Sequence, residues 1–391
     1  MSKRFSLAVG ALMAGSIIVA IPAQASKYSV VYSFKGGADG ANPFSGLIEV
    51  GGTLYGVTYF GGASGKGTAF GVTPAGSETM LYSFQGGDDG MNPWGGLTDV
   101  NGTLYGTTNS GGVDNLGTVF KMTTAGVKAT LYSFTGGLDG TYPVNIGGLT
   151  KFGANLYGTT SGGGLGASCG SPGCGTVFKM SLSGNEKVLF RFGNYADDAV
   201  FPLGEFLKFD GELYGTSFNN NNADAPLGAI FKINKQGKES VLHLFGTGTD
   251  GADPVGGLIN VDGTFYGTTE SGGANEYGTV FSITPAGVEK VLYSFKGGET
   301  DGAGPQTSLI EVDGVLYGTT GNGGSEGVQS TGTVFKITLD GQETIIHKFG
   351  PVEGPDASVP LGNLIKVGGR LYGTTYGGGA NGKGTVFEIK P

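Results

Sequence analysis

Short apolar segments separated by turns recur along the whole chain. Residues 96–134 hold one period, in the order GLTDV (96–100), TLYGTT (103–108), GTVFKMT (117–123) and KATLYSF (128–134). These segments are rich in β-branched and aromatic residues, as strands are, and Asn101-Gly102 is typical of a tight hairpin. No segment has the spacing of an amphipathic helix. The pattern predicts a four-stranded antiparallel meander.

The motif LYGTT and its near copies set the period of the repeat. Its tyrosine returns at steps of 50 to 57 residues, at Tyr55, Tyr105, Tyr157, Tyr214, Tyr266, Tyr317 and Tyr372. A period near 50 residues with four strands in each unit is typical of propeller blades. Seven copies of the motif therefore predict seven blades.

The two ends of the repeat array complement each other. The last set of strands ends with GTVFEIK before Pro391 and lacks a fourth strand. YSVVYSF (28–34) matches KATLYSF but precedes the first inner strand. We predict that this N-terminal strand joins the C-terminal blade, because closing the ring removes exposed sheet edges. The predicted fold is all-β, a seven-bladed β-propeller with four antiparallel strands per blade, over residues 26–391.

The first 25 residues differ from the rest of the chain. Lys3 and Arg4 precede an apolar run at 5–21, which closes on Ala23-Gln24-Ala25. This order is typical of a secretory signal peptide, and we assign residues 1–25 to it. A retained membrane anchor is the alternative, but the run is short and ends in a cleavage site. We expect a secreted or periplasmic monomer without a membrane span.

Composition narrows the range of partners. Glycine makes up 81 of 391 residues, and aromatic residues make up 11%. This combination favours many tight turns between packed strands and argues against disorder. Loss of Lys3 and Arg4 with the leader leaves 21 basic residues against 32 acidic ones, a net charge of −11. A chain with this negative charge repels the phosphate backbone of nucleic acids. We therefore expect no nucleic-acid partner.

The recurring LYGTT, GTVFK and LYSF, with glycine-rich loops between them, resemble the GloVer-type tandem repeats of exported bacterial proteins, a choice-of-anchor family. The likeness covers residues 28–391. The resemblance implies export and a propeller-like repeat. It implies no defined activity.

The two cysteines, Cys169 and Cys174, stand close together in CGSPGC. Export to an oxidising compartment favours a disulfide that staples this loop. A structural zinc site at these cysteines would take four ligands, and the chain has only two histidines, His243 and His347. His243 and His347 occupy a slot of the outer strand that is aromatic elsewhere, so we expect them to be structural. We assign no metal site and no catalytic residue.

Each of the seven blade crossings has one aspartate four residues before its proline. These residues are Asp39, Asp89, Asp139, Asp198, Asp250, Asp301 and Asp356. Asp-Gly is a turn signal, because the carboxylate can bond nearby backbone. Recurrence in every blade favours this role, and we expect no cofactor. The alternative is a ring of carboxylates near the axis that holds calcium.

Ligand sites are expected on the face that carries the long glycine-rich loops. The slot after the motif varies between blades and includes Tyr59, Phe218, Glu270 and Tyr376. Tyr59 and Tyr376 belong to neighbouring blades once the ring closes. Aromatic rings suit sugar binding, which also makes Trp94 a candidate. The candidate binding residues are Tyr59, Tyr376, Trp94, Phe218, Asn220 and Glu270.

Two of the aromatic residues permit a different interpretation. Trp94 and Phe44 share a slot with Val144, Leu203, Val255 and Leu361 in other blades, which favours a place in the core. Asn220 belongs to a run of four asparagines that could equally form a solvated loop.

The sequence favours a non-catalytic exported propeller that binds a glycan or a cell-surface protein on its long-loop face. An extracellular polysaccharide hydrolase or lyase is one alternative, and a structural envelope protein is another. No pair of acids stands out at the separation that glycoside hydrolysis requires.

Overall fold

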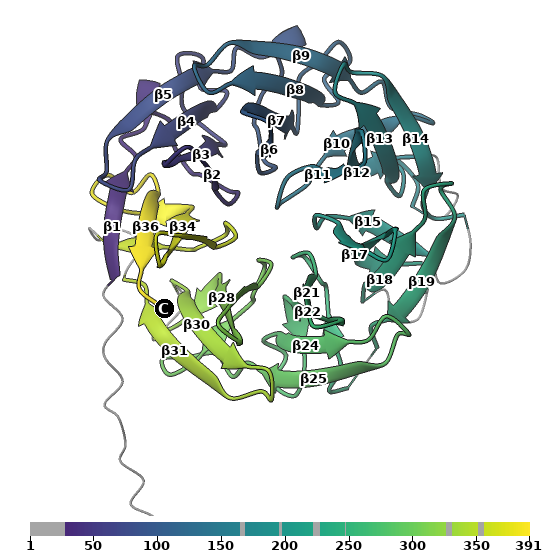
Figure 1. The fold of residues 1–391 in the computed structure, drawn as a ribbon, viewed down its shortest axis with the longest axis vertical. Helices are drawn as coiled ribbons and strands as arrows, with labels where there is room; N and C mark the ends of the chain where they lie inside the picture. Colours follow the sequence, from purple (N-terminus) through teal and green to yellow (C-terminus); the bar gives the residue numbers. More distant parts are fainter. Residues whose placement is uncertain are drawn as a thin grey trace, which may run out of the picture.

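Seven antiparallel sheets surround a central axis as blades (Figure 1). The computed structural model describes residues 28–164, 169–194, 198–221, 227–246, 248–325, 331–350 and 356–391. The signal peptide assigned to residues 1–25 lies outside these residues. Apart from two short 3-10 turns, Gly37–Asp39 and Gly87–Asp89, the described residues form strands, turns and loops. The predicted all-β, seven-bladed propeller is confirmed.

Blades 1 to 4 follow one another along the chain. Blade 1 holds β2 (Ile48–Val50), β3 (Thr53–Thr58), β4 (Thr68–Val72) and β5 (Glu78–Ser83); blade 2 holds β6 (Thr98–Val100), β7 (Thr103–Thr108), β8 (Thr118–Thr123) and β9 (Lys128–Ser133). Blade 3 holds β10 (Gly140–Pro143), β11 (Thr150–Phe152), β12 (Asn155–Gly163), β13 (Thr176–Ser181) and β14 (Glu186–Arg191); blade 4 holds β15 (Ala199–Pro202), β16 (Leu207–Phe209), β17 (Glu212–Asn220), β18 (Ala229–Ile233) and β19 (Glu239–Leu244).

Blades 5 to 7 repeat the arrangement, each with a short two-stranded ladder. Blade 5 holds β21 (Ile259–Val261), β22 (Thr264–Thr269), β24 (Thr279–Ile283) and β25 (Glu289–Ser294), with β20 (Gly251–Ala252) and β23 (Ser271–Gly272). Blade 6 holds β27 (Ile310–Val312), β28 (Val315–Thr320), β30 (Thr333–Thr338) and β31 (Glu343–Lys348), with β26 (Gly302–Ala303) and β29 (Asn322–Gly323). Blade 7 holds β33 (Ile365–Val367), β34 (Arg370–Thr375), β36 (Thr385–Ile389) and β1 (Tyr28–Ser33), with β32 (Ala357–Ser358) and β35 (Gly377–Gly378).

The first strand of the chain closes the ring. β1 pairs antiparallel with β36, from Tyr28 opposite Ile389 to Ser33 opposite Thr385. Figure 1 shows purple β1 alongside yellow β36. The predicted completion of the last blade by the N-terminal strand is therefore confirmed.

The core lies between neighbouring blades. Tyr105 of blade 2 packs in one buried cluster with Leu156 and Phe178 of blade 3, and similar clusters recur around the ring. The motif glycine is required by this packing. A Cβ on Gly106 would lie 2.6 Å from the ring of Phe120, closer than real contacts allow. The LYG triplet recurs because the aromatic ring of the adjacent strand fills the space above its glycine.

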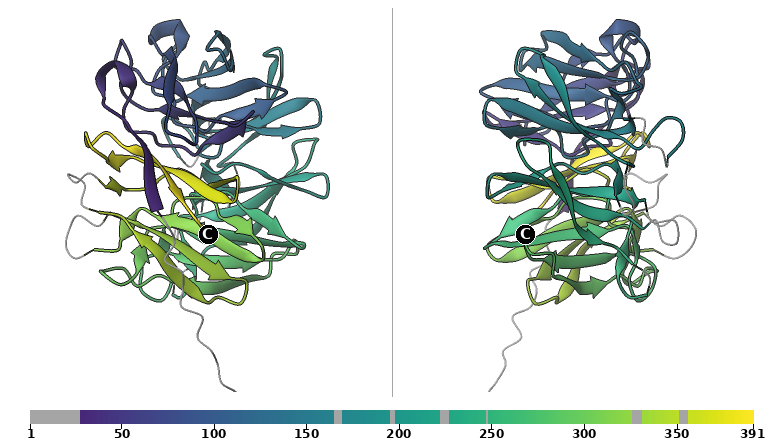
Figure 2. Two further views of the ribbon diagram at one scale, coloured as in Figure 1. Left: turned by 60° about the vertical axis from the view of Figure 1, so that its left-hand side comes forward. Right: turned by 90° about the vertical axis from the view of Figure 1, so that its right-hand side faces the viewer.

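The long connections share one face, as predicted. Each blade crossing pairs with the loop between the second and third strands, for example at the bridges Ala41 to Phe60 and Met91 to Ser110. Figure 2 shows the ring from the side. Cys169 and Cys174 in such a loop form the expected disulfide, with Cα atoms 5.3 Å apart. Among the described residues, no helix has the length and hydrophobicity to span a membrane.

Candidate functional site

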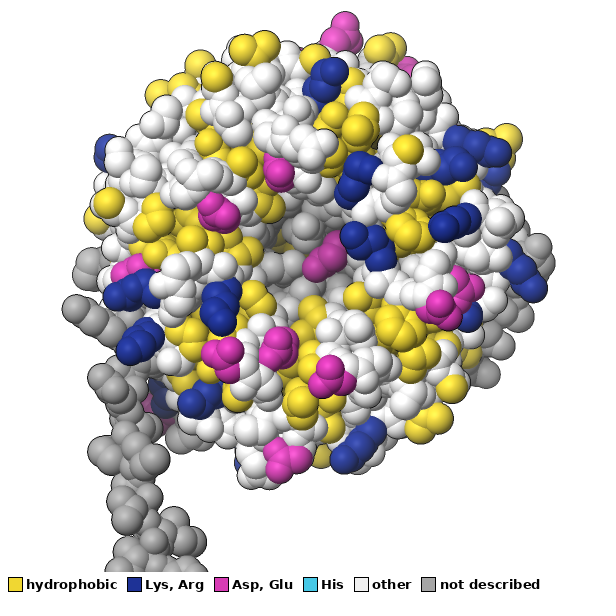
Figure 3. Space-filling model, viewed as in Figure 1, with side chains coloured by type: hydrophobic (Ala, Val, Ile, Leu, Met, Phe, Trp, Pro, Cys, Tyr) yellow, Lys and Arg dark blue, Asp and Glu magenta, His cyan; other side chains and the backbone are white. Residues whose placement is uncertain are grey.

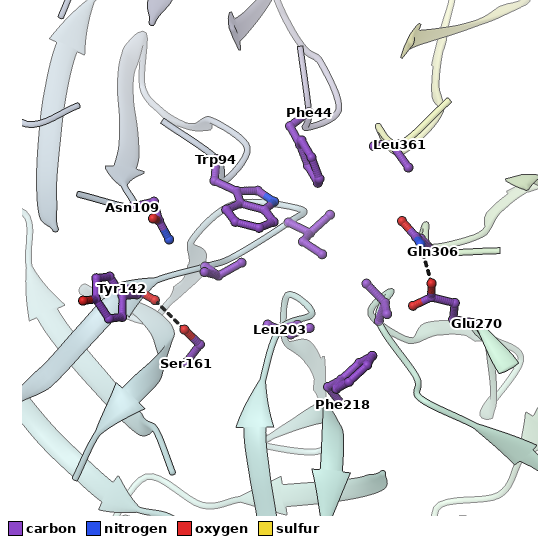
Figure 4. A pocket seen from close by; sticks show the side chains of 13 residues that line it. Phe44, Trp94, Asn109, Tyr142, Ser161, Leu203, Phe218, Glu270, Gln306 and Leu361 are labelled. Carbon is purple, nitrogen blue, oxygen red and sulfur yellow. Dashed lines mark hydrogen bonds between the residues drawn. The ribbon is translucent and has the colours of Figure 1, made fainter. Parts of the chain in front are cut away.

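A cavity of about 490 Å³ lies at the axis among the long loops (Figure 4). Every blade contributes to its lining, which consists of Phe44, Trp94, Asn109, Tyr142, Val144, Ile146, Ser161, Leu203, Phe218, Val255, Glu270, Gln306 and Leu361. Seven of these residues directly follow the seven crossing prolines. Because the ring is closed, equivalent positions converge on the axis and build one site from seven repeats.

The slot that follows each crossing proline has both of the roles considered for it above, packing in the core and lining a site. Val144 and Val255 are buried, whereas Trp94 and Phe44 are only half-buried and face the cavity. Trp94 and Leu203 pack against the buried cluster of Val144, Ile146 and Val255, which agrees with the place in the core expected for this slot. Side chains here pack on one another and line the axial cavity at the same time.

Four aromatic rings gather on one side of the cavity. The ring centroids of Phe44 and Trp94 are 4.7 Å apart, and the ring of Tyr376 lies 5.7 Å from that of Phe44. Tyr59 lies 5.8 Å from Trp94, and burial, with Tyr376 nearby, raises the pKa of its hydroxyl. Closure of the ring thus brings both Tyr59 and Tyr376 next to Phe44, but neither tyrosine is among the residues that line the cavity. The indole Nε1 of Trp94 is buried without a hydrogen-bond partner among the described residues.

Polar side chains occupy separate parts of the lining, with Asn109 next to Trp94 and with Glu270 and Gln306 farther away (Figure 4). Gln306 Nε2 donates a hydrogen bond of 2.7 Å to Glu270 Oε1 (Figure 4). Burial raises the pKa of Glu270 and outweighs this hydrogen bond, and the neighbouring Asp253 adds to the effect. Asn109 and Ser161 supply further polar groups to the lining. The cavity thus combines aromatic rings with hydrogen-bonding groups, as small-molecule sites commonly do.

Two residues of the fourth blade were also candidates. Phe218 lines the cavity and packs beside Val144, Ile146 and Val255. Asn220 is buried at the end of β17, where its Nδ2 donates a hydrogen bond of 2.8 Å to the carbonyl of Gly228. The structure therefore brings Trp94, Phe218 and Glu270 together in the cavity, whereas Asn220 joins two segments of its own blade.

A second axial cavity, of about 250 Å³, contains a carboxylate that sequence reasoning missed. Glu205 Oε1 accepts hydrogen bonds from Ser308 Oγ at 2.6 Å and Asn363 Nδ2 at 3.1 Å. These three residues occupy a slot before the inner strand that is glycine at positions 46, 96, 148 and 257. That departure from glycine was the signal that could have revealed them. Figure 3 shows the ring hollowed at its centre, with acidic and basic side chains around the hollow.

The seven aspartates lie on the outer rim and not at the axis. Each carboxylate accepts a hydrogen bond of 2.7–3.0 Å from a backbone N–H four to six residues earlier. In several blades the other partner is a tyrosine of the outermost strand, as where Tyr82 donates to Asp89 at 2.6 Å. These contacts are those of the turn-forming role expected for the aspartates, and each aspartate belongs to a separate junction between blades, whereas the alternative of a calcium ring would need them to converge near the axis.

At five of these junctions the next blade adds a glutamate. The pairs are Asp39 with Glu78, Asp139 with Glu186, Asp198 with Glu239, Asp250 with Glu289, and Asp301 with Glu343. Burial, and then the adjacent aspartate, raises the pKa of four glutamates to about 7 and that of Glu239 to about 8. Between blades 1 and 2 the glutamate is replaced by Lys128, whose Nζ lies 2.8 Å from Asp89 Oδ1.

The histidines occupy the aromatic slot of the outer strands, as expected. His243 meets Phe245 edge to face at a centroid distance of 4.9 Å, and His347 meets Phe349 at 4.8 Å. Tyr32 and Phe34 have the same arrangement at 5.2 Å.

The repeats match a family model over residues 8–169 and 164–387, together nearly the whole chain. The chain belongs to the Gloeobacter/Verrucomicrobia repeat family. This confirms the resemblance carried by the LYGTT, GTVFK and LYSF motifs. Among curated proteins, no sequence matches this member of the family.

Solved propellers resemble this family member in fold. A putative 6-phosphogluconolactonase from Bacteroides uniformis is 14% identical, with a TM-score of 0.52 over 83% of this chain and 89% of that one. Puromycin hydrolase is 12% identical, with a TM-score of 0.52 over 86% and 50% of the two chains. PorZ, a surface component of the type-IX secretion system of Porphyromonas gingivalis, is 14% identical, with a TM-score of 0.54 over 92% and 47%. The chain spans about half the length of the last two, and such identities show the fold alone.

Proposed function

We propose that this protein is an exported propeller that binds a glycan in the axial cavity of its long-loop face. The observation that carries the proposal is the lining of that cavity, which combines aromatic rings with hydrogen-bonding groups (Figure 4). The faces of Trp94 and Phe44 can pack against the CH groups of a sugar ring. Asn109 and the Glu270–Gln306 pair can bond its hydroxyl groups.

The shape and chemistry of the cavity favour the end of a glycan chain over a protein surface. Its volume of about 490 Å³ lies in the range of small-ligand sites. Its residues come from all seven blades, so the walls are held by the closed ring and need little ordering when a ligand binds.

The small number of carboxylates in the cavity favours binding without hydrolysis of the glycan. Glu270 is the one carboxylate among the residues that line the cavity in the described part of the chain. Glycoside hydrolysis normally uses two carboxyl groups that flank the scissile bond. The lining therefore supports recognition more than hydrolysis.

One observation favours catalysis as the second candidate. Burial raises the pKa of Glu270, and a carboxyl group that holds its proton can act as a general acid. A polysaccharide hydrolase or lyase would use Glu270 in this way, with a second group supplied by the substrate or by a bound water molecule.

The test uses residues 26–391, which contain the whole ring. A glycan array identifies ligands, and calorimetry measures affinity for the parent and for Trp94→Leu, which installs the residue of blades 4 and 7 in this slot. We expect about fivefold weaker binding, since an aromatic contact is worth about 1 kcal/mol. Met80→Ala, at an exposed position on β5, is the control and should bind as the parent does.

Three results decide between the candidates. Failure of every glycan to bind, or equal affinity of Trp94→Leu and the parent, contradicts the proposed site. New reducing ends or unsaturated products that disappear in Glu270→Gln would establish the enzyme instead.

A further inference from the structure

The junction between blades 4 and 5 combines three side chains with metal-ligating atoms. His243 lies near the end of outer strand β19, Asp250 lies in the crossing to blade 5, and Glu289 begins β25. One ligand atom from each residue lies within 4.8 Å of the others, the one such group among the described residues. We propose that this junction binds a first-row divalent metal ion, with zinc as the best match.

The distances fit a shared metal better than a hydrogen bond. His243 Nε2 lies 3.4 Å from Asp250 Oδ2, beyond the usual N–H···O range of about 2.7–3.2 Å. Two ligands bound to tetrahedral zinc at about 2.0–2.1 Å stand about 3.4 Å apart. The third ligand atom, a carboxylate oxygen of Glu289, lies within 4.8 Å of the other two, so its side chain would have to move closer when the metal binds.

Two potential ligand atoms at this junction have no hydrogen-bond partner among the described residues. His243 Nε2 and Glu289 Oε1 are buried, and neither has a hydrogen bond within the described part of the chain. Buried polar atoms are normally paired, so a cation between them would satisfy both. It would also relieve the repulsion between the carboxylates of Asp250 and Glu289.

The surroundings already orient the aspartate. Its Oδ2 accepts a hydrogen bond from the Gly246 N–H and its Oδ1 accepts one from the Gly251 N–H, both at 2.9 Å. Such outer contacts fix a ligating carboxylate before the metal arrives. The His243 ring is held edge to face against Phe245, so two of the ligands are positioned by the fold.

Other junctions of the same ring serve as internal comparisons. Between blades 1 and 2, Lys128 supplies a cation of its own, with Nζ 2.6 Å from the Asp89 carbonyl and 2.8 Å from its carboxylate. Where tyrosine fills the slot, its hydroxyl satisfies the aspartate, as Tyr293 does for Asp301 at 2.7 Å. Only the junction of His243 brings an imidazole to an Asp–Glu pair among the described residues.

His347 shows why the imidazole alone is insufficient. It stacks on Tyr28 with ring centroids 3.7 Å apart, and the hydroxyl of Tyr28 donates to Asp356 Oδ1 at 2.8 Å. Tyr28 stands where Glu289 stands in the other junction, so the third ligand is replaced by a ring.

The ligand set also selects the type of metal. Calcium prefers six to eight oxygen ligands, whereas one imidazole and two carboxylates suit zinc with an added water molecule. The bound ion would join blade 4 to blade 5 at the rim of the ring. None of its three ligands is among the residues that line the axial cavity. The site is therefore independent of glycan binding.

The test measures Zn²⁺ binding to residues 26–391 after chelator treatment, by calorimetry and by the visible absorption of the Co²⁺ form. We expect one equivalent to bind and the melting temperature to rise with Zn²⁺ and fall with chelator. His243→Tyr installs the residue of four other blades, so the metal-free variant should fold normally. It should bind Zn²⁺ at least tenfold more weakly and lose the Co²⁺ band.

His347→Tyr is the matched control, because it makes the same substitution in the same slot two blades away. It should retain the affinity of the parent, while Glu289→Gln should lose it as His243→Tyr does. Absence of Zn²⁺ binding in the parent overturns the proposal, as does equal affinity in His243→Tyr. Binding of several equivalents of Ca²⁺, insensitive to His243, with no such Zn²⁺ site would also overturn it, since the acidic pairs alone would explain the result.

Discussion

The glutamates at the blade junctions predict that the propeller loses stability as the pH rises through neutrality. In the folded chain the pKa of Glu343 is raised from its ordinary value of 4.5 to about 7, first by burial and then by Asp301. Between these two values the folded protein holds a proton that the unfolded chain has lost. Unfolding therefore releases protons, so the stabilising contribution is full below pH 4.5 and disappears as the pH passes about 7.

The magnitude follows from the size of the shift. The rise in the pKa of Glu343 from 4.5 to about 7 corresponds to roughly 3.4 kcal/mol for a fully buried group. Glu343 is only half-buried, and solvent screening reduces this value to roughly 1.5 kcal/mol. Five such glutamates together can change the free energy of unfolding by several kcal/mol, a large share of the roughly 5–15 kcal/mol of a typical domain.

Glu343→Gln is the sharpest perturbation, because glutamine keeps the size of the side chain and cannot ionise. At pH 8.5 we expect the variant to be more stable than the parent by roughly 1.5 kcal/mol, since it removes the repulsion from Asp301. At pH 5 the two should differ by less than roughly 0.5 kcal/mol. Urea denaturation at pH 5, 7 and 8.5, followed by the fluorescence of Trp94, measures both differences.

Glu299→Gln is the matched control, because Glu299 is exposed in the crossing that follows β25. It should follow the pH dependence of the parent. Stability of the parent that does not change between pH 5 and 8.5 would refute the reasoning. Equal destabilisation of Glu343→Gln at every pH would refute it too, because the side chain would then act through packing and not through its charge.

Three further predictions concern the fold. Deletion of residues 28–34 should abolish cooperative melting, because it opens blade 7 and removes Phe34, which is fully buried and worth roughly 1.5–3 kcal/mol by itself; a thermal melt within a few degrees of the parent would contradict ring closure. Asp139→Ala should cost roughly 1–3 kcal/mol in urea denaturation and Asp139→Asn less, because asparagine can still accept the hydrogen bond from the Thr135 N–H. Gly106→Ala should lower the stability by roughly 1–3 kcal/mol, because the new methyl group meets the ring of Phe120; an unchanged melting temperature would show that the ring can move aside.

Much of the fold could be predicted because its determinants are local. The alternation of apolar runs with glycine-rich turns fixes the strands, and the recurrence of LYGTT fixes the number of blades. The match between 28–34 and the fourth strand of other repeats was enough to predict closure. Closure in turn predicted that Tyr59 and Tyr376 would lie near each other, although more than 300 residues separate them.

The candidate site was only partly predictable. Trp94, Phe218 and Glu270 were identified as candidates from variation between repeats, and the structure places all three in the axial cavity. Glu205 was not predicted, although the slot that it occupies before the inner strand is glycine at positions 46, 96, 148 and 257. Asn220 was a candidate because it stands in a run of four asparagines. Its side chain instead points inward and donates to the carbonyl of Gly228. The direction of a side chain cannot be read from the residue type.

The sequence by itself determined the strands, their order, the blade count and the pairing of the two chain ends, because turns and hydrophobic periodicity act over a few residues. Only the tertiary structure decided which side of each repeat faces the axis and which faces the rim. Asp250 and Glu289 are 39 positions apart and become neighbours only when one blade packs on the next. Their burial, and hence the raised pKa of Glu289, arises from that packing, since desolvation depends on everything around a group and not on its neighbours in the chain.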